Sequence, residues 1–147
     1  MESGLRDRSV LITGASGGIG RALAEAFAAE GAELTLSGNA KTSELESWVA
    51  EQPWRDRARC VAADVRDADA LATACERACE ATGRLDVCIA NAGIWPPGDD
   101  GLHDVGVERL RDTLEINLLG AMLTARAFLA TLARTGPRGD GTGASLV

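Results

Sequence analysis

Several residue types that carry out chemistry are rare or missing in this chain of 147 residues. The sequence has no tyrosine and only one histidine, His103, which we expect on a surface loop rather than in a catalytic role. Cys75 and Cys79 are four residues apart on an expected helix, a spacing that suits a metal ion. One histidine and no CxxC pair supply too few ligands for zinc, however, so we expect no metal site.

Long apolar runs and an excess of basic residues are also missing. No stretch approaches the roughly 18 uninterrupted apolar residues of a membrane span, and residues 1–8 (MESGLRDR) are too charged for a signal peptide. The chain has 22 acidic against 15 basic residues, and its arginines are scattered. Nucleic acids and anionic membranes require a clustered basic face. We therefore expect a cytoplasmic protein with reduced cysteines and with no nucleic-acid or membrane partner.

The remaining composition is typical of one soluble globular domain or part of one, because 46% of the residues are hydrophobic and 25% are charged. Short β-rich runs alternate with longer segments of helical period, which predicts an α/β fold of βαβ units around a parallel sheet. Strands are expected at residues 9–12, 34–37, 59–63, 85–90 and 144–147. Helices are expected at residues 18–30, 67–81 and 107–134. A further short helix is expected to open with a capping box of Ser43 and Glu46 and to end at Pro53.

Residues 13–20 (TGASGGIG) lie where the first expected strand turns into the first helix. Glycines let the chain turn tightly and approach a phosphate closely, while free N–H groups and the helix dipole stabilise the phosphate charge. The segment therefore predicts a site for the pyrophosphate of a dinucleotide, although a turn needed only for strand–helix packing remains the alternative. The candidate binding residues here are Gly14, Ser16, Gly17, Gly18, Ile19 and Gly20.

Polar residues also follow the third and fourth expected strands. Asp64 is placed to accept a hydrogen bond from an adenine amino group beside the apolar wall of Val65; its alternative role is to cap the next helix. Asn91, at the start of the segment Asn91-Ala92-Gly93, can tie together the backbone of a crevice at the topological switch point, where Gly93 leaves room for a ribose. The alternative for this segment is a plain turn.

Asn117 interrupts the longest expected helix. Asparagine forms helices poorly, and this one stands between Ile116 and Leu118, where we expect burial. A solvent-facing asparagine is the alternative.

The glycine spacing TGxxxGxG, followed in order by Asp64-Val65, Asn91-Ala92-Gly93 and Asn117, resembles the short-chain dehydrogenase/reductase family over the whole chain. The resemblance implies a Rossmann-type, doubly wound parallel sheet in three α/β/α layers. It also implies hydride transfer between a nicotinamide cofactor and an alcohol or ketone. In that family the asparagine that matches Asn117 perturbs its helix and holds a water of the proton relay. The long helix forms a dimer interface there, which implies a homo-oligomer, either a dimer or a tetramer.

The family's catalytic serine, tyrosine and lysine all lie beyond the fifth strand, so only Asn117 of the catalytic set is present in this sequence. A half-made fifth strand would also leave an open sheet edge. We therefore expect residues 1–147 to be a single cofactor-binding domain, incomplete at its C-terminus and inactive alone, within a longer reductase. The alternatives are a non-catalytic dinucleotide-binding fragment or sensor, and an extended-branch sugar-nucleotide enzyme, whose usual TGxxGxxG spacing this chain does not match.

The end of the second expected strand bears on the choice between NADP and NAD. Residues 37–41 (SGNAK) contain no acid to bind a ribose 2′-hydroxyl, and Gly38 takes its place. A 2′-phosphate would then meet no repulsion, and Lys41, Asn39, Ser37 or Arg21 can contact it. NADP-preferring relatives commonly carry a basic residue where Asn39 or Gly17 stands, so NAD stays open. We expect NADP.

Trp95 follows the Asn91 segment together with Ile94 and Pro96. These residues predict one wall of a substrate pocket and hence a bulky or apolar substrate. A tryptophan that only covers a loop is the alternative.

Overall fold

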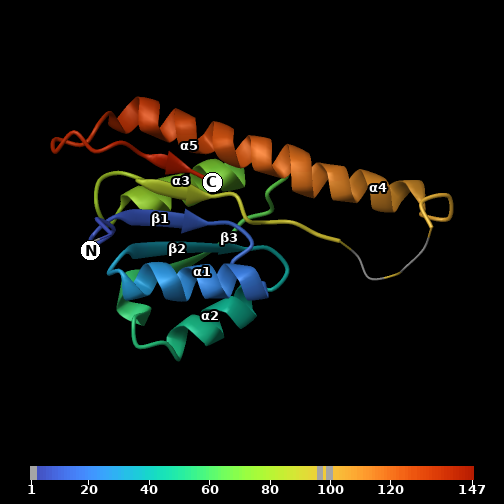
Figure 1. Ribbon diagram of the computed structural model, residues 1–147, viewed down its shortest axis with the longest axis horizontal. Coiled ribbons are helices and arrows are strands. Elements are labelled where there is room, and N and C mark those ends of the chain that lie inside the picture. The colour runs from blue at the N-terminus through green and yellow to red at the C-terminus, as the bar shows by residue number, and fades with distance from the viewer. Residues whose placement is uncertain (1–2, 96–97, 99–100) are drawn as a thin grey trace.

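The computed structural model describes residues 3–95, 98 and 101–147, and their strands form one parallel sheet between two layers of helices (Figure 1). Among these residues the sheet has five strands in the order β3-β2-β1-β4-β5, and every neighbouring pair is parallel. The strands are β1 (Ser9–Ile12), β2 (Glu33–Gly38), β3 (Ala58–Ala62), β4 (Val87–Ile89) and β5 (Ser145–Leu146). The α/β fold expected from the alternating pattern is confirmed.

The helices lie on both faces of the sheet because each strand presents apolar side chains to both sides. They are α1 (Gly18–Ala29), α2 (Thr42–Ala50), the 3₁₀ turn η1 (Arg55–Arg57), α3 (Ala68–Cys79), α4 (Val107–Leu114), the π-helical segment η2 (Glu115–Gly120) and α5 (Ala121–Thr135). In β1, Val10 and Ile12 pack with α1 and α2, whereas Leu11 packs with α3 and with Phe128 of α5. Figure 1 shows these two helical layers on either side of the strands.

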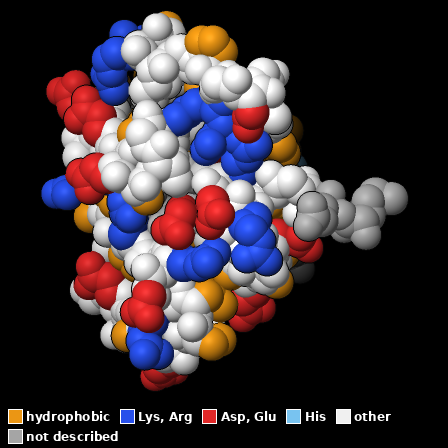
Figure 2. Space-filling model, turned by 90° about the vertical axis from the view of Figure 1, so that its left-hand side faces the viewer, with side chains coloured by type: hydrophobic (Ala, Val, Ile, Leu, Met, Phe, Trp, Pro, Cys, Tyr) orange, Lys and Arg blue, Asp and Glu red, His pale blue; other side chains and the backbone are white. Residues whose placement is uncertain are grey.

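The order of the strands places the functional edge of the sheet. From β1 the chain proceeds outward through β2 and β3, and then returns to form β4 on the other side of β1. The connections after β1 and β4 therefore leave the sheet in opposite directions, which opens a crevice at the carboxyl ends of these two strands. Basic and acidic side chains lie interspersed on the opposite face, at the amino ends of the strands (Figure 2).

The short helix α2 does not begin as the sequence predicted. Its first residue is Thr42, and no side chain forms a capping hydrogen bond at its N-terminus, so the expected capping box of Ser43 and Glu46 is wrong. The hydroxyl of Thr42 instead donates to the carbonyl of Asn39, 2.7 Å away. That contact starts the helix one residue before the expected cap, which places Ser43 inside the helix.

The long helix also differs from its expectation, because it is neither uniform nor evenly buried. The π-helical segment η2 divides it, and Figure 1 shows α4 extending beyond the sheet. Its outer face is exposed and consists of Leu114, Leu118, Met122 and Leu129. By length and composition alone, Val107–Thr135 could cross a membrane, a test that core helices of soluble proteins also pass. The search for uninterrupted apolar residues did not single out this helix, because charged residues interrupt its apolar positions.

Candidate functional site

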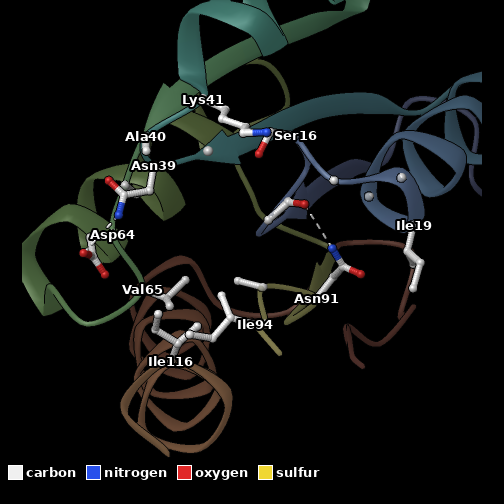
Figure 3. Close-up of a pocket in the computed structure, with 18 residues that line it drawn as sticks. Ser16, Ile19, Asn39, Ala40, Lys41, Asp64, Val65, Asn91, Ile94 and Ile116 are labelled. Atoms are coloured by element: carbon white, nitrogen blue, oxygen red, sulfur yellow. Dashed lines mark hydrogen bonds between the residues drawn. The ribbon is translucent and has the colours of Figure 1, made fainter. Parts of the chain in front are cut away.

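A cavity of about 560 Å³ lies at the carboxyl edge of the sheet, beside the crevice between β1 and β4. Thirteen residues that the sequence predicted to bind the cofactor line it, and Figure 3 shows side chains from four separate connections that surround it. The expected residues are Gly14, Ser16, Gly17, Gly18, Ile19, Gly20, Gly38, Asn39, Asp64, Val65, Asn91, Ala92 and Gly93. The cavity is also lined by Ala40, Ala63 and Ile116, which the sequence did not predict. Small or apolar side chains beside a motif do not by themselves indicate a binding site.

The glycines between β1 and α1 serve two different purposes. Gly14 has φ +64°, and a Cβ there would lie 2.6 Å from the Cα of Ala92; a Cβ on Gly20 would lie 2.5 Å from the carbonyl oxygen of Gly14. These two glycines are therefore required by packing. A Cβ on Gly18 would meet no atom within 4 Å, and one on Gly17 would have an ordinary contact at 3.6 Å. Packing alone does not account for Gly17 and Gly18, which line the cavity.

Asn91 joins the ends of β1 and β4. Its Nδ2 donates to the carbonyl oxygens of Thr13 and Gly14 at 3.0 and 3.2 Å, and Figure 3 shows the side chain directed toward that turn. The hydroxyl oxygen of Thr13 in turn accepts a hydrogen bond from the N–H of Ala92 at 3.1 Å. The amide of Asn91 thus ties the crevice's backbone together, as the sequence predicted.

Asp64 is ionised and held by hydrogen bonds. Arg66 donates to it from its backbone N–H and from its guanidinium, and Asn39 donates from Nδ2. The side-chain hydrogen bond from Arg66 is the main cause that lowers the pKa of Asp64 to about 2. The alternative role as a helix cap is wrong for Asp64, because Asp67 caps α3 by accepting from the N–H groups of Asp69 and Ala70.

Asn117 lies within η2 and binds the backbone that follows β4. Its Oδ1 accepts from the N–H of Ile94 and its Nδ2 donates to the carbonyl of the same residue, both at 2.8 Å. The expected burial is wrong, because Asn117 is exposed on a helix that extends past the sheet. Its amide is nevertheless bound to Ile94 rather than directed to water, and its helix is perturbed at this point.

The β2 side of the cavity contains Gly38, Asn39, Ala40 and Lys41 and therefore no acid among its described residues. One of the expected phosphate contacts is wrong, because Ser37 is fully buried outside the cavity lining. Arg21 also lies outside the lining, with its guanidinium 5.1 Å from the ring centroid of Trp48, and its contact with a phosphate stays a prediction.

Comparison with known proteins agrees with this geometry. Residues 8–141 match the short chain dehydrogenase family. The chain belongs to this family. Among the chain's relatives, 1-deoxy-11-beta-hydroxypentalenate dehydrogenase of Streptomyces arenae is 36% identical over 132 residues, which cover 88% of this chain and 46% of the relative. L-rhamnose 1-dehydrogenase (NAD(P)(+)) of Sphingomonas sp. is 34% identical over 137 residues, which cover 92% of this chain and 53% of the relative.

Solved structures of short-chain dehydrogenases share the fold. One from Burkholderia cenocepacia in complex with NADP has a TM-score of 0.75 and 31% identity, covering 86% of this chain and 51% of that one. Another, from Brucella melitensis, has a TM-score of 0.80 and 30% identity, and the match covers 89% of this chain and 55% of that one. The chain spans about half the length of the curated relatives it matches.

The expected substrate wall is only partly described. Ile94 lines the cavity. Trp95 is 68% exposed, and the guanidinium of Arg109 lies 5.2 Å from its ring centroid. Pro96 lies outside the described residues. His103 is exposed beside Asp104, away from the residues that line the cavity. The only titratable side chains among the described lining residues are Lys41 and Asp64. These residues can bind and orient a ligand, but they offer no acid or base suited to proton transfer near neutral pH.

Proposed function

We propose that the protein is an NAD(P)-dependent oxidoreductase of small alcohols or ketones, in which this chain binds the cofactor. The observation that carries the proposal is the cavity at the switch point, which is lined by the glycine turn and has open space over Gly17 and Gly18. A pyrophosphate requires such a close approach to backbone N–H groups at a helix N-terminus. The dehydrogenase names of the relatives support the same reaction class.

The site residues take separate parts in this proposal. Asp64 and Val65 receive the adenine, and Gly38 and Asn39 flank the ribose of the adenosine. The ribose of the nicotinamide half is bordered by Asn91, Ala92 and Gly93. The pyrophosphate site is formed by Gly14, Ser16, Gly17, Gly18, Ile19 and Gly20. When bound, the nicotinamide would supply or accept the hydride. Asn117 is the proposed catalytic residue, positioned by its two bonds to Ile94. Because the sequence has no tyrosine, we infer that the 147 residues alone are inactive.

Substituting Gly18 by alanine tests the pyrophosphate site directly. The added methyl group would meet no protein atom within 4 Å, so the melting temperature should stay unchanged. It would stand in the space that a phosphate needs, so the affinity for NADPH should fall by about tenfold, the effect of roughly 1.4 kcal/mol. Calorimetric titration of NADPH and NADH measures this, with G139A as the matched control, since Gly139 also has open space but lies outside the cavity lining. Unchanged affinity in G18A, or no binding by the wild type, would overturn the proposed function.

Substituting Gly38 by aspartate tests the expected preference for NADP. The new carboxylate would repel a 2′-phosphate and accept a hydrogen bond from a 2′-hydroxyl. A Cβ at this position would lie 3.4 Å from the Oγ1 of Thr42, so the side chain fits with little adjustment. We expect G38D to lower NADPH affinity at least about tenfold while NADH affinity holds or rises. The uncharged variant G38N is the matched control; wild-type protein that binds NADH much more tightly than NADPH would contradict the preference.

A non-catalytic dinucleotide-binding module is the second candidate. It is favoured by the lack of a suitable acid or base among the described lining residues. An assay of ketone-dependent NADPH oxidation, carried out on the protein as its gene encodes it, separates the two: turnover supports the oxidoreductase, and tight binding without turnover on a panel of ketones and alcohols supports the module.

Self-association belongs to the same proposal. The outer face of the long helix leaves Leu114, Leu118, Met122 and Leu129 between 57% and 61% exposed. Exposed apolar side chains grouped in this way are typical of an interface. We propose that the protein is a homo-oligomer.

A further inference from the structure

We propose that Arg66 is a positioning residue that sets the selectivity of this site for adenine over other purines, by aiming the carboxylate of Asp64 at the amino group of the base. The inference rests on the proposed function. It concerns a residue outside the cavity lining, which acts on the ligand only through Asp64.

The contact between Arg66 and Asp64 fixes both oxygens of the carboxylate. Oδ1 accepts from the backbone N–H of Arg66 at 2.9 Å and from its Nε at 3.0 Å, and Oδ2 accepts from Nη2 at 2.6 Å. A fork of two parallel N–H donors defines the plane of a carboxylate, which a single point charge cannot do. Asp64 therefore has little freedom to rotate.

The guanidinium is itself held from a second side. Its Nη1 lies 3.8 Å from the Oε2 of Glu115, the first residue of η2. The adjacent Val65 packs against the same segment, since a Cβ on Gly120 would lie 2.5 Å from its Cγ2. Arg66 thus connects the loop after β3 to the helix that carries Asn117, and both supports limit its movement.

Asn39 marks the place that an adenine amino group would occupy. Its Nδ2, a planar amino group, donates to the Oδ2 of Asp64 at 3.0 Å, and Figure 3 shows that nitrogen directed at the carboxylate from the side of the cavity. Asn39 is exposed, so its side chain can turn aside at little cost. The exocyclic amino group of adenine is the same kind of donor and would replace it on Oδ2.

This arrangement makes the site discriminate between an amino group and a keto oxygen. An ionised carboxylate only accepts hydrogen bonds, so hypoxanthine, which carries a keto oxygen in place of the amino group, would present a second acceptor to it at the exocyclic position and would have to shift to offer its ring N1–H instead. The side-chain hydrogen bond from Arg66 lowers the pKa of Asp64 further below its ordinary range, so the carboxylate is an acceptor only. Without the guanidinium of Arg66 the carboxylate would lose the two parallel donors that define its plane, and discrimination would fall.

The test compares two ligands that differ in one group, nicotinamide adenine dinucleotide and nicotinamide hypoxanthine dinucleotide, in calorimetric titrations of wild type and variants. We expect wild type to prefer the adenine form by at least about tenfold, as for one hydrogen bond to a charged group. R66A should reduce that preference to about threefold or less. R66K keeps the charge but loses the pair of parallel donors, so its preference for the adenine form should be intermediate between those of wild type and R66A.

A matched control makes the outcome decisive. R111A removes another exposed arginine with an ion pair, to Glu108 at 2.6 Å, and should leave the preference unchanged. A purely structural role of Arg66 would weaken both dinucleotides equally, so R66A with the wild-type preference overturns the inference. Wild type that binds neither dinucleotide overturns the proposed function instead, and R66K decides the question if R66A does not fold.

Discussion

Replacing Gly14 by alanine is expected to abolish dinucleotide binding and to lower the free energy of unfolding by about 3 kcal/mol, the sum of backbone strain and overpacking. The residue has φ +64°, and its Cβ would lie 2.6 Å from the Cα and 3.0 Å from the N of Ala92. Ala92 cannot yield easily, because its N–H is bound to Thr13 and the neighbouring Asn91 holds the carbonyl of Gly14. Separating β1 from the end of β4 would open the turn that forms the cavity.

Urea denaturation and calorimetric titration of NADPH measure the two effects of G14A. The matched control is G83A, because Gly83 also has a positive φ, +76°, but a Cβ there would meet nothing within 4 Å. G83A introduces the backbone strain but no close contact with another residue, so it should lower the free energy of unfolding by about 1 kcal/mol and leave dinucleotide binding unchanged. If G14A were no more destabilised than G83A, the close approach to Ala92 would not matter to the fold.

Replacing Asp86 by asparagine is expected to destabilise the protein by about 4 kcal/mol, because the buried Arg84 and the half-buried Arg138 would lose their partner. Asp86 is 3% exposed and accepts from the Nε and Nη2 of Arg138 at 2.6 and 2.5 Å and from the N–H of Ser9 at 3.0 Å. The buried Arg84 lies 3.5 Å away. Asparagine keeps the shape of the side chain but removes its charge and replaces one acceptor oxygen by an N–H donor, so urea denaturation of D86N measures the loss of the ion pair together with the hydrogen bonds to that oxygen.

The same carboxylate predicts a dependence of stability on pH. Burial by itself would raise the pKa of Asp86, but the hydrogen bonds from Arg138 and Ser9 outweigh burial, and the pKa lies below its ordinary value. A carboxyl whose folded pKa is lowered stabilises the fold above its unfolded pKa, about 3.9, and loses that contribution as the pH falls through its folded value. The difference in the free energy of unfolding between wild type and D86N should therefore become smaller below about pH 4. D56N, at a side chain 91% exposed, is the control and should show no such difference at any pH.

Particular residues show how far sequence reasoning reached. The glycine turn and the strands were predicted correctly, because each follows from the order of residues within one βα connection. The tie made by Asn91 to Thr13 and Gly14 was predicted from the expected position of the fourth strand beside the first at the topological switch point. The capping box at Ser43 was wrong because the competing bond from Thr42 to Asn39 depends on how β2 ends. Ser37 was wrong as a phosphate contact because it is fully buried within β2, outside the cavity lining.

The sequence by itself determined the alternation of strands and helices, the place of the glycine turn and the polar residues at the strand ends, since these depend on neighbours along the chain. Only the tertiary structure decided that Asn117 binds Ile94, 23 residues away, that Arg138 neutralises Asp86 across 52 residues, and that much of the long helix faces outward. Such pairings arise when the sheet brings distant segments together, and no local pattern of residues specifies which partners will meet.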